Sequence, residues 1–441
     1  MNRREFMKRS TAMGVSAGMM SSVRSSRVPP SDRITVGIIG SGARAQQLMD
    51  AMALMPDVEM VAVSDAYQGR AERARARTGG RAKIVKDYKE ILADSQVDTV
   101  LIGTPDHWHK TMVVESVEAG KDVYCEKPLT YSVDEGLEIV DAVKRTNRIL
   151  QVGSQGMSSP TQEQARKIVQ EGKLGKVTMI RASYNRNTAS GAWIYPIPPD
   201  ASEKTIDWQA FLGPAPDHPF SRERFFRWRC YWDYSGGIST DLFVHLVTTI
   251  HFVMNATMPK TVIGSGELYR WTESRDVPDT VNAILIYPEN FTVNLSSTFN
   301  NQSSSESGFE ILGTEGSLVF RGGEIRYLPE NNYEDNRWVV RSWPEELEKA
   351  YYNDPQVQQQ ESPWTWEPQV KTSLNSWEEW GQDATFIHAR RFFDAVRSRK
   401  QPVQDARFGH HAASCAHMIN MSIRDGGRPV EWDFNRDNVK A

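Results

Sequence analysis

Residues 34–45, Ile-Thr-Val-Gly-Ile-Ile-Gly-Ser-Gly-Ala-Arg-Ala, decide the fold of this chain. The apolar run predicts a strand buried on both faces, and the glycines that end it mark a tight turn into a helix. Gly40 permits the turn, Gly42 lets backbone N–H groups approach a pyrophosphate, and Ala45 allows the helix to pack closely. The turn therefore predicts a dinucleotide site made by Gly40, Ser41, Gly42, Ala43 and Arg44, with Arg44 placed to cover a phosphate.

Four more apolar runs follow, separated by segments of helical composition, at residues 58–64, 99–103, 122–125 and 149–153. Strands that alternate with helices at this spacing indicate an α/β fold with a doubly wound parallel sheet, here over residues 32–153. Asp65 ends the second run, where a carboxylate accepts hydrogen bonds from the adenosine ribose and repels a 2′-phosphate. We therefore expect NAD as the cofactor, with NADP possible because Arg70 and Arg73 follow closely.

The pattern changes in the second part of the chain, residues 154–441, which we expect to be a substrate-binding and oligomerisation domain of the α+β class. Longer alternating runs predict a large, mostly antiparallel open sheet with strands at 179–184, 261–269, 282–287, 291–299, 308–313 and 317–321. Helices are expected at 237–254, 377–397 and 408–424, the last two closing the chain. Residues 330–375 are polar, Gln-rich and without periodicity, so we expect a long excursion there.

Composition narrows the classes of function. The chain has 441 residues, enough for two cores, and a formal net charge of −4. No excess of basic residues supports a nucleic-acid partner, because phosphate binding needs a clustered basic surface. The three cysteines, Cys125, Cys230 and Cys415, are far apart and form no CxxC pair, so we expect neither a metal site nor a disulfide framework.

The first 31 residues have the character of a targeting segment. Arg3 and Arg4, with Phe6 and Lys8 after them, are close to a twin-arginine export signal. The weakly apolar stretch that follows, residues 11–20, is too short and polar to span a bilayer. We therefore expect the protein to be exported through the twin-arginine pathway to the periplasm, with no membrane span.

Three further motifs carry polar groups suited to chemistry. Residues 104–109, Thr-Pro-Asp-His-Trp-His, follow the third strand, at the edge where open α/β sheets bind ligands. Glu126-Lys127-Pro128 ends the fourth strand. Asp241 and His245 are four residues apart on a predicted helix and share one face. An imidazole is suited to exchange a hydroxyl proton near neutral pH, so His245 is a candidate general base.

Each of these motifs also has a purely structural alternative. His245 could be a packed helix residue satisfied by Asp241, and His109 could only cap the helix that follows it. For His107 we expect a surface position. The histidines at 107 and 109 have no third metal ligand nearby in the sequence, which argues against a metal site there.

The glycine-rich turn at residues 40–45, Glu126-Lys127-Pro128 and the segment from Asp241 to His245 together resemble the Gfo/Idh/MocA group of nicotinamide-dependent sugar and polyol oxidoreductases, over roughly residues 33–330. The resemblance implies that Thr104, Pro105, Trp108 and His109 wall the nicotinamide end of the cofactor, and that Glu126 lies by the nicotinamide ribose. Gln155 takes the position of a further cofactor contact. Lys127 corresponds to the ammonium that orients and polarises the reacting hydroxyl, and with Asp241 and His245 it completes the implied catalytic set.

Substrate contacts are expected in the second domain. Residues 193–234 hold eleven aromatic side chains, whose faces suit the C–H faces of sugar rings. We expect Trp193, Arg227 and Trp232 to contact a sugar or polyol, and the resemblance adds Tyr184.

Two other functions stay open. Some exported relatives cleave glycosides with bound NAD by oxidation, elimination and reduction, but they carry a Tyr-x-x-His element where this chain has Asp241-x-x-x-His245. A catalytically silent sugar-binding protein would be expected to lack Lys127 or His245.

We also expect a homodimer or homotetramer, because the resembled family commonly pairs its sheets. Ile284, Ile286, Val293 and Leu295 are expected to share one face of neighbouring strands, with further apolar residues on the other face.

Overall fold

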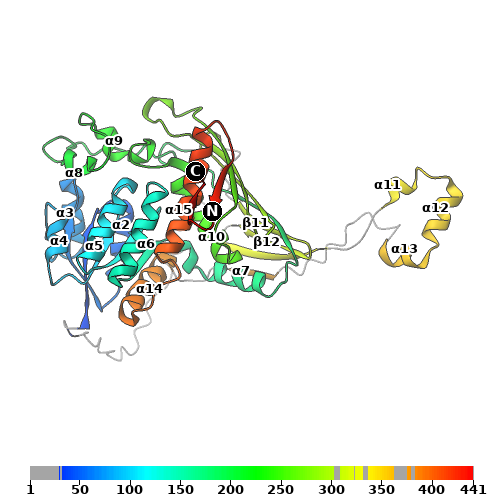
Figure 1. The fold of residues 1–441 in the computed structure, drawn as a ribbon, viewed down its shortest axis with the longest axis horizontal. Coiled ribbons are helices and arrows are strands. Elements are labelled where there is room, and N and C mark those ends of the chain that lie inside the picture. The colour runs from blue at the N-terminus through cyan, green and yellow to red at the C-terminus, as the bar shows by residue number, and fades with distance from the viewer. Residues whose placement is uncertain are drawn as a thin grey trace, which may run out of the picture.

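The chain folds around two β-sheets (Figure 1). The computed structural model describes residue 29 and residues 32–301, 308–321, 323–330, 336–361, 375–378 and 383–440. The twin-arginine segment lies outside these residues. No helix among them is both long enough and apolar enough to cross a bilayer.

The first sheet has six parallel strands in the order β3-β2-β1-β4-β5-β6. Its strands are β1 (Ile34–Ile39), β2 (Val58–Ser64), β3 (Lys83–Ile84), β4 (Thr99–Ile102), β5 (Asp122–Glu126) and β6 (Leu150–Gly153). The five predicted strands are confirmed, while the exposed two-residue β3 had no apolar signal. Because the strand order reverses between β1 and β4, this sheet has its ligand crevice at the carboxyl ends of these two strands.

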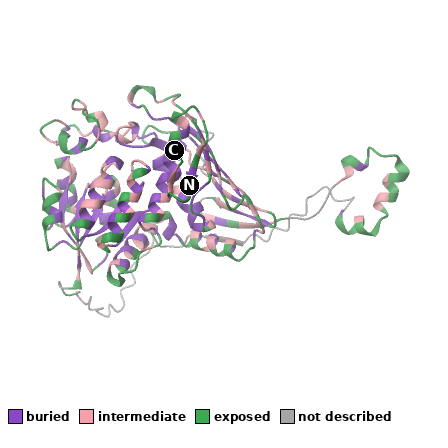
Figure 2. Cartoon of the chain, viewed as in Figure 1, coloured by how far each residue is buried: buried purple, intermediate pink, exposed green. Residues whose placement is uncertain are grey.

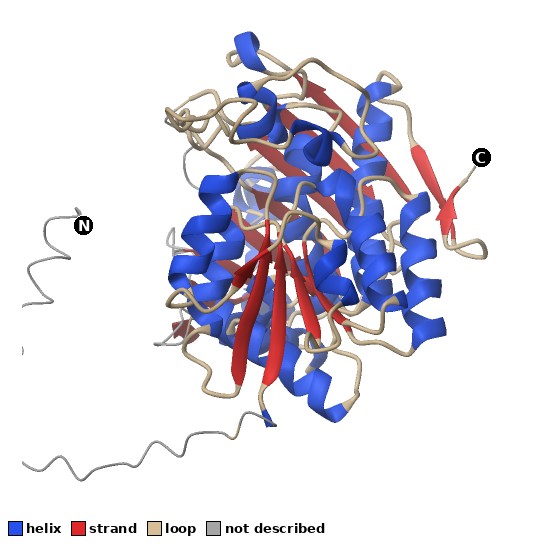
Figure 3. Cartoon of the chain, turned by 90° about the vertical axis from the view of Figure 1, so that its left-hand side faces the viewer, coloured by secondary structure: helices blue, strands red, loops and turns tan. Residues whose placement is uncertain are grey.

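Helices cover both faces of the parallel sheet (Figure 3). One face packs against α2 (Ala43–Met52), α3 (Gln68–Arg77) and α14 (Ala384–Ser398). The other packs against α4 (Lys89–Ala93), α5 (His109–Glu118) and α6 (Asp134–Thr146). Helix α14 comes from the far end of the chain, and its Phe392 and Phe393 are fully buried in the core of the first sheet. The last part of the sequence therefore stabilises the half that contains the parallel sheet.

The second sheet has ten strands in the order β14-β13-β12-β11-β7-β10-β9-β8-β15-β16, of which only β7 and β10 pair in parallel. Its strands are β7 (Val177–Ser183), β8 (Thr261–Glu267), β9 (Thr280–Ile286), β10 (Thr292–Thr298), β11 (Gly308–Gly313), β12 (Gly316–Arg321), β13 (Glu324–Pro329), β14 (Asn375–Glu378), β15 (Val430–Asp433) and β16 (Asn438–Val439). The predicted mostly antiparallel sheet is confirmed, and four of its strands, β13 to β16, were not predicted.

The inner face of the large sheet packs on α7 (Pro160–Gln170), α10 (Val244–Met254) and α15 (Ala406–Arg424). The predicted grouping of its apolar residues was wrong. Val293 and Leu295 pair with Leu285 and Ala283 and are buried with them, whereas Ile284 pairs with Asn294 and is 46% exposed. The alternation of residues along each strand could not show which residues of the two strands lie together, because the register across the β9–β10 turn decides which residues share a face.

The end of the chain also differs from expectation in its helix boundaries. The predicted helix over 377–397 was wrong at its start, because β14 pairs with β13 there and α14 begins at Ala384, where Asp383 accepts a hydrogen bond from the backbone N–H of Thr385. Within the predicted excursion, three short helices lie apart from both sheets in Figure 1: α11 (Arg337–Val340), α12 (Glu345–Tyr352) and α13 (Pro355–Gln360). Most of their side chains are exposed (Figure 2).

Residues 193–234, which we name the aromatic strap, leave the second half of the molecule and cross to the first. The strap carries α8 (Trp208–Leu212) and α9 (Arg222–Phe226), which lie above α3 in Figure 1. Tyr67 and Ile206 form a β-bridge, and the backbone N–H of Asp207 donates to the carbonyl O of Ala66 at 2.7 Å. Phe211, Phe225 and Phe226 pack with Tyr67 in a separate hydrophobic cluster. Most aromatic residues of the strap therefore fasten the two halves together.

Candidate active site

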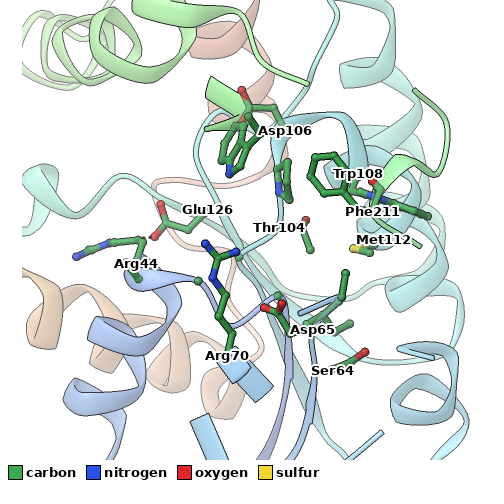
Figure 4. Close-up of a pocket in the computed structure, with 18 of the residues that line it drawn as sticks. Arg44, Ser64, Asp65, Arg70, Thr104, Asp106, Trp108, Met112, Glu126 and Phe211 are labelled. Atoms are coloured by element: carbon green, nitrogen blue, oxygen red, sulfur yellow. Dashed lines mark hydrogen bonds and ion pairs between the residues drawn. The ribbon is translucent and has the colours of Figure 1, made fainter. Parts of the chain in front are cut away.

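A cavity of about 1610 Å³ lies at the carboxyl ends of β1 and β4, beneath the strap and against α10. A pocket for one drug-sized ligand usually measures about 300–1,000 Å³, so this cavity has room for a cofactor and a substrate. In the close-up of Figure 4, Ser64 and Asp65 lie at one end, Asp106 at the other, and Thr104 between them.

The glycine-rich turn forms the floor of the cavity and leads into α2. Gly42 is the N-cap of α2, and no side chain caps the helix. A Cβ on Gly42 would meet no atom within 4 Å, because its Cα faces the cavity. Gly40 has φ +77°, and a Cβ there would approach the Thr104 backbone N to 2.8 Å. Uncapped N–H groups beside open space suit the diphosphate of a dinucleotide, so these residues fit NAD.

Asp65 lines the cavity at the end of β2 and also holds the turn in place. Its Oδ2 accepts hydrogen bonds from Ser41 N at 2.7 Å and Ser41 Oγ at 3.2 Å, and its Oδ1 accepts from Tyr67 N at 2.8 Å. Ser41 is fully buried and does not line the cavity. Its contribution is therefore to orient the carboxylate that was predicted to meet the adenosine ribose.

Glu126, Gln155 and Arg44 form a connected group on the wall next to Lys127. Glu126 Oε1 accepts a hydrogen bond from Gln155 Nε2 at 2.7 Å and lies 3.4 Å from Arg44 Nε. All three line the cavity. The structure thus places Arg44 beside Glu126, with its Nη1 2.9 Å from Gln47 Oε1 and its Nη2 3.4 Å from Thr385 Oγ1.

Lys127 is held in a defined direction by Asp241. Its Nζ donates to the main-chain O and to Oδ1 of Asp241, both at 2.8 Å. Arg229 Nε donates to the same Oδ1, also at 2.8 Å. Burial alone raises the pKa of Asp241, but the two cations outweigh burial and hold the pKa far below its usual value. Asp241 is therefore a fixed anion that positions two cationic groups, and no hydrogen bond between its carboxylate and His245 is found.

His245 projects from the first turn of α10 into the cavity. Among the residues that the structure describes, no hydrogen-bond partner is found for its ring, and the ring centroid of Tyr184 lies 6.4 Å away. Burial and the nearby Lys127 lower the pKa of His245 to about 3, so the imidazole is neutral at neutral pH. The segment before α10, Ser239–Phe243, is a π-helical turn, an irregularity that often marks functional sites and that carries Asp241 next to Lys127.

The turn after β4 divides into residues that face the cavity and residues that support them. Thr104, Pro105 and Trp108 line the cavity. His109 does not: it is 1% exposed, with Nδ1 at 2.6 Å from Pro128 O and Nε2 at 3.1 Å from Thr104 O. Its predicted position at the nicotinamide wall was wrong, because the ring lies behind the wall and links its two segments. The expected surface position of His107 was also wrong: it is 4% exposed, packed under the strap.

Three of the four predicted substrate residues lie outside the cavity. Trp193 is fully buried, with its ring 5.2 Å from that of Phe299. Arg227 Nε donates to the carbonyl O of Tyr195, and Trp232 packs under Arg424. The structure therefore does not bring these three residues to the cavity, because an aromatic or basic residue type does not indicate which way the strap turns its side chains. Tyr184 does line the cavity.

Five further side chains line the cavity near the catalytic group: Asp106, Arg186, Tyr195, Trp228 and Arg229. Asp106 follows Pro105 in the singled-out turn, so its position was the available signal. Burial raises its pKa to about 7, against the opposing effects of Lys127 and Arg229. The other four lie in irregular segments, where sequence carries no periodic signal. Within the described residues, no group of three or more His, Cys, Asp or Glu side chains is placed to hold a metal ion.

Comparison with known proteins assigns the two halves of the chain. Residues 34–154 match the model of an oxidoreductase family with an NAD-binding Rossmann fold, and residues 210–319 match the GFO/IDH/MocA C-terminal domain, together more than half of the chain. Levoglucosan dehydrogenase of Pseudarthrobacter phenanthrenivorans is 26% identical over 317 residues, which are 65% of this chain and 73% of that one.

A second relative matches over a shorter stretch. The scyllo-inositol 2-dehydrogenase (NAD(+)) of Bacillus subtilis is 37% identical over 122 residues, 28% of this chain and 35% of the relative. The solved levoglucosan dehydrogenase in complex with NADH and levoglucosan shares the fold with a TM-score of 0.65 at 20% identity, over 90% of this chain and 99% of that one. With its glycine-rich turn, its NAD-binding domain and its matching C-terminal domain, this chain belongs to the Gfo/Idh/MocA family of oxidoreductases.

Proposed function

We propose that this protein is an NAD-dependent dehydrogenase that oxidises a secondary hydroxyl of a sugar or polyol. The observation that carries the proposal is the meeting, in one cavity, of the Lys127 ammonium, held by Asp241, with the neutral ring of His245. Relatives named as levoglucosan and inositol dehydrogenases support the substrate class.

Each residue of the site has a separate role in the proposed reaction. When bound, NAD supplies the acceptor for the hydride that leaves the substrate carbon. Lys127 donates two N–H bonds to Asp241, which leaves its third N–H for the substrate oxygen. His245 receives the hydroxyl proton at a ring nitrogen, since its lowered pKa keeps the ring unprotonated before the reaction. Asp241 keeps the ammonium in place.

NAD would be held along the floor of the cavity. The N–H groups at the start of α2, at Gly42 and Ala43, would meet the diphosphate, and Asp65 the adenosine ribose. Glu126 and Gln155 would meet the nicotinamide end.

We further propose that the protein is exported with NAD already bound, in line with the twin-arginine sequence at its start. The strap supports the idea of a retained cofactor: Tyr67 and Trp108 of the cofactor half bond to Asp200 and to the Phe211 carbonyl O of the strap at 2.7 and 2.9 Å. Release of NAD would require part of this closure to open. Denaturing freshly purified protein and identifying the released nucleotide tests retention, and fractionating the source cells tests export.

The outer face of the large sheet supports a proposed homodimer or homotetramer. Arg181, Ile284 and Asn294 lie on this face around a second hollow of about 660 Å³. Ile284 is exposed in the isolated chain, and apolar surface gathered on the open face of a sheet can mark the place where a second subunit packs. Light scattering at micromolar concentration tests this, and a 50 kDa monomer would contradict it.

The activity itself is tested by adding monosaccharides, glycosides and inositols to the NAD-loaded protein and following nicotinamide absorbance. Reduction of NAD by a free sugar or polyol supports a dehydrogenase. Release of an aglycone without net reduction would instead support the glycoside-cleaving alternative.

A further inference from the structure

The substrate end of the cavity holds more positive than negative charge. Lys127, Arg186 and Arg229 all line it, and Asp241 is the one carboxylate of this end with a strongly lowered pKa. Lys127 and Arg229 share a single oxygen of that carboxylate. Glu126, on the wall next to Lys127, is paired with Arg44, and Asp106, with its raised pKa, is only partly ionised at neutral pH.

Arg229 is fixed in a position that presents donors to the cavity. Its Nε is bonded to Asp241, and its guanidinium lies 4.1 Å from the ring centroid of Trp228. The side chain is still 24% exposed, and no partner within the described part of the chain is found for its two terminal nitrogens. A guanidinium held at Nε keeps its outer edge, with two parallel N–H groups, for a ligand.

Arg186 lines the same cavity and has no carboxylate partner among the described residues. Its Nη1 donates to the carbonyl O of Gly191 at 3.1 Å, and its guanidinium lies 5.4 Å from the ring centroid of Tyr184, beside His245. The oxidised nicotinamide ring would add a further positive charge to this region. A partly desolvated cation without a counter-ion is unfavourable, and an anionic ligand would remove that cost.

We propose that the substrate is an anionic sugar, specifically a sugar acid whose carboxylate binds the outer edge of Arg229 with Arg186 as the second cation. A planar carboxylate matches the two parallel N–H groups of a guanidinium, which makes such pairs directional as well as strong. This inference rests on the proposed dehydrogenase function and narrows its substrate class.

Matched substrates test the inference. The kcat/KM of the NAD-loaded enzyme is measured for D-glucuronate, its methyl ester and D-glucose, and for D-galacturonate and D-galactose, with D-glucose 6-phosphate as a phosphate arm. We expect the acids to exceed the neutral members by about 10-fold to 100-fold at low salt, as expected for a hydrogen bond to a charged group. A preference for the phosphate over the acids would overturn the carboxylate assignment.

Variants separate the charge effect from damage to the site. Arg229→Gln and Arg186→Gln should each lower the acid-to-neutral ratio of kcat/KM about tenfold or more. Arg145→Gln removes the same charge at an exposed pair with Glu118, away from the cavity lining, and it should leave the ratio unchanged. Arg186 does not contact Asp241, so its variant tests charge without disturbing the Lys127 contact.

The outcomes distinguish this inference from the function on which it rests. Equal or better oxidation of the neutral sugars would overturn the inference and leave the dehydrogenase intact. If no compound in the set reduces bound NAD, the NADH-loaded enzyme is titrated by calorimetry with D-glucuronate and with D-glucose. Binding of D-glucuronate but not of D-glucose, with loss of that binding in Arg229→Gln, supports the inference. Absence of D-glucuronate binding to the wild type overturns it.

Discussion

The ammonium of Lys127 contacts Asp241 twice, through the main-chain O and through Oδ1, each at 2.8 Å. Lys127 directly follows β5 of the first sheet and Asp241 lies in the π-helical turn before α10 of the second half. The contact therefore joins the two halves at the point where the substrate is proposed to react, and it fixes the direction of the remaining N–H of Lys127.

Replacing this ammonium should stop turnover and leave the cofactor bound. In Lys127→Met the hydroxyl oxygen loses its donor, and removal of one such donor costs roughly 10²- to 10³-fold in rate. Turnover and nucleotide content are measured on the same preparation. Lys110→Met, at a surface pair with Glu138, is the control and should behave as wild type. Loss of NAD together with activity would mean that Lys127 holds the cofactor instead.

His245 should act as a base whose titration lies well below neutral pH. Its pKa is lowered to about 3 by burial and by Lys127, so the neutral form prevails across the range in which a free imidazole would become protonated. The pH profile of kcat/KM should therefore show no loss of activity near pH 6.5 on the acid side. His245→Ala should cost roughly 10² to 10⁴ in rate. Near-full activity of His245→Ala would return the residue to a packing role.

Substitutions at two glycines of the turn should have different effects, one on cofactor binding and the other on the stability of the fold. Gly42 has φ −62° with open space at its Cβ position, so Gly42→Ala should keep the melting temperature and weaken NAD binding by intruding on the diphosphate. Gly40 has φ +77° and a crowded Cβ position. Gly40→Ala should destabilise the fold by about 1–3 kcal/mol or more. Calorimetry of NAD binding and of unfolding checks both, and the reverse pattern would contradict the assignment of the cavity.

Asp65 should set the preference for NAD. Asp65→Ser removes a negative charge that would lie beside a 2′-phosphate. A change of about 1.4 kcal/mol in binding free energy corresponds to a tenfold change in affinity. The ratio of NAD to NADP affinity should therefore fall at least about tenfold. Asp87→Ser, on the rim of the same cavity, is the matched control. An unchanged ratio in Asp65→Ser would place the ribose elsewhere.

The fold should lose stability steeply below pH 6.5. Burial lowers the pKa of His251 to about 3 and that of His388 and His417 to about 4. The unfolded chain takes up protons at these groups below pH 6.5 while the folded chain does not. Their contribution is thus complete above pH 6.5 and is lost as pH falls, at up to about 1.4 kcal/mol per histidine per pH unit.

A histidine variant checks the origin of this acid sensitivity. The free energy of unfolding is measured from pH 5 to 7.5 for the wild type and for His251→Phe, whose ring would keep its packing near Tyr287 and Phe408. The slope of the free energy of unfolding against pH should fall by the amount that corresponds to about one proton taken up on unfolding. An unchanged slope would mean that His251 is not the source.

Local sequence predicted the first half well. Each strand of the parallel sheet except β3 is an apolar run long enough to be predicted as a strand from its own residues. The glycine turn has a backbone conformation that few other residue types adopt. Lys127 could be singled out from the tripeptide Glu126-Lys127-Pro128, and His245 from its spacing to Asp241, because each motif defines the position of its residue. In the second half, by contrast, Ile284 and Val293 were placed on the same face because no local pattern encodes the register between β9 and β10.

The sequence by itself determined the strands of the first sheet other than β3, the dinucleotide turn and the types of residue available for proton transfer, because these depend on neighbours three or four residues away. Only the tertiary structure decided which polar groups meet. Arg229 reaches Asp241 and Asp241 reaches Lys127 across 114 residues of chain. Trp193 turns into the core while Trp228 faces the cavity, although both belong to the strap. Such choices depend on the packing of the strap against both sheets, where the burial of whole surfaces outweighs the preference of any single side chain.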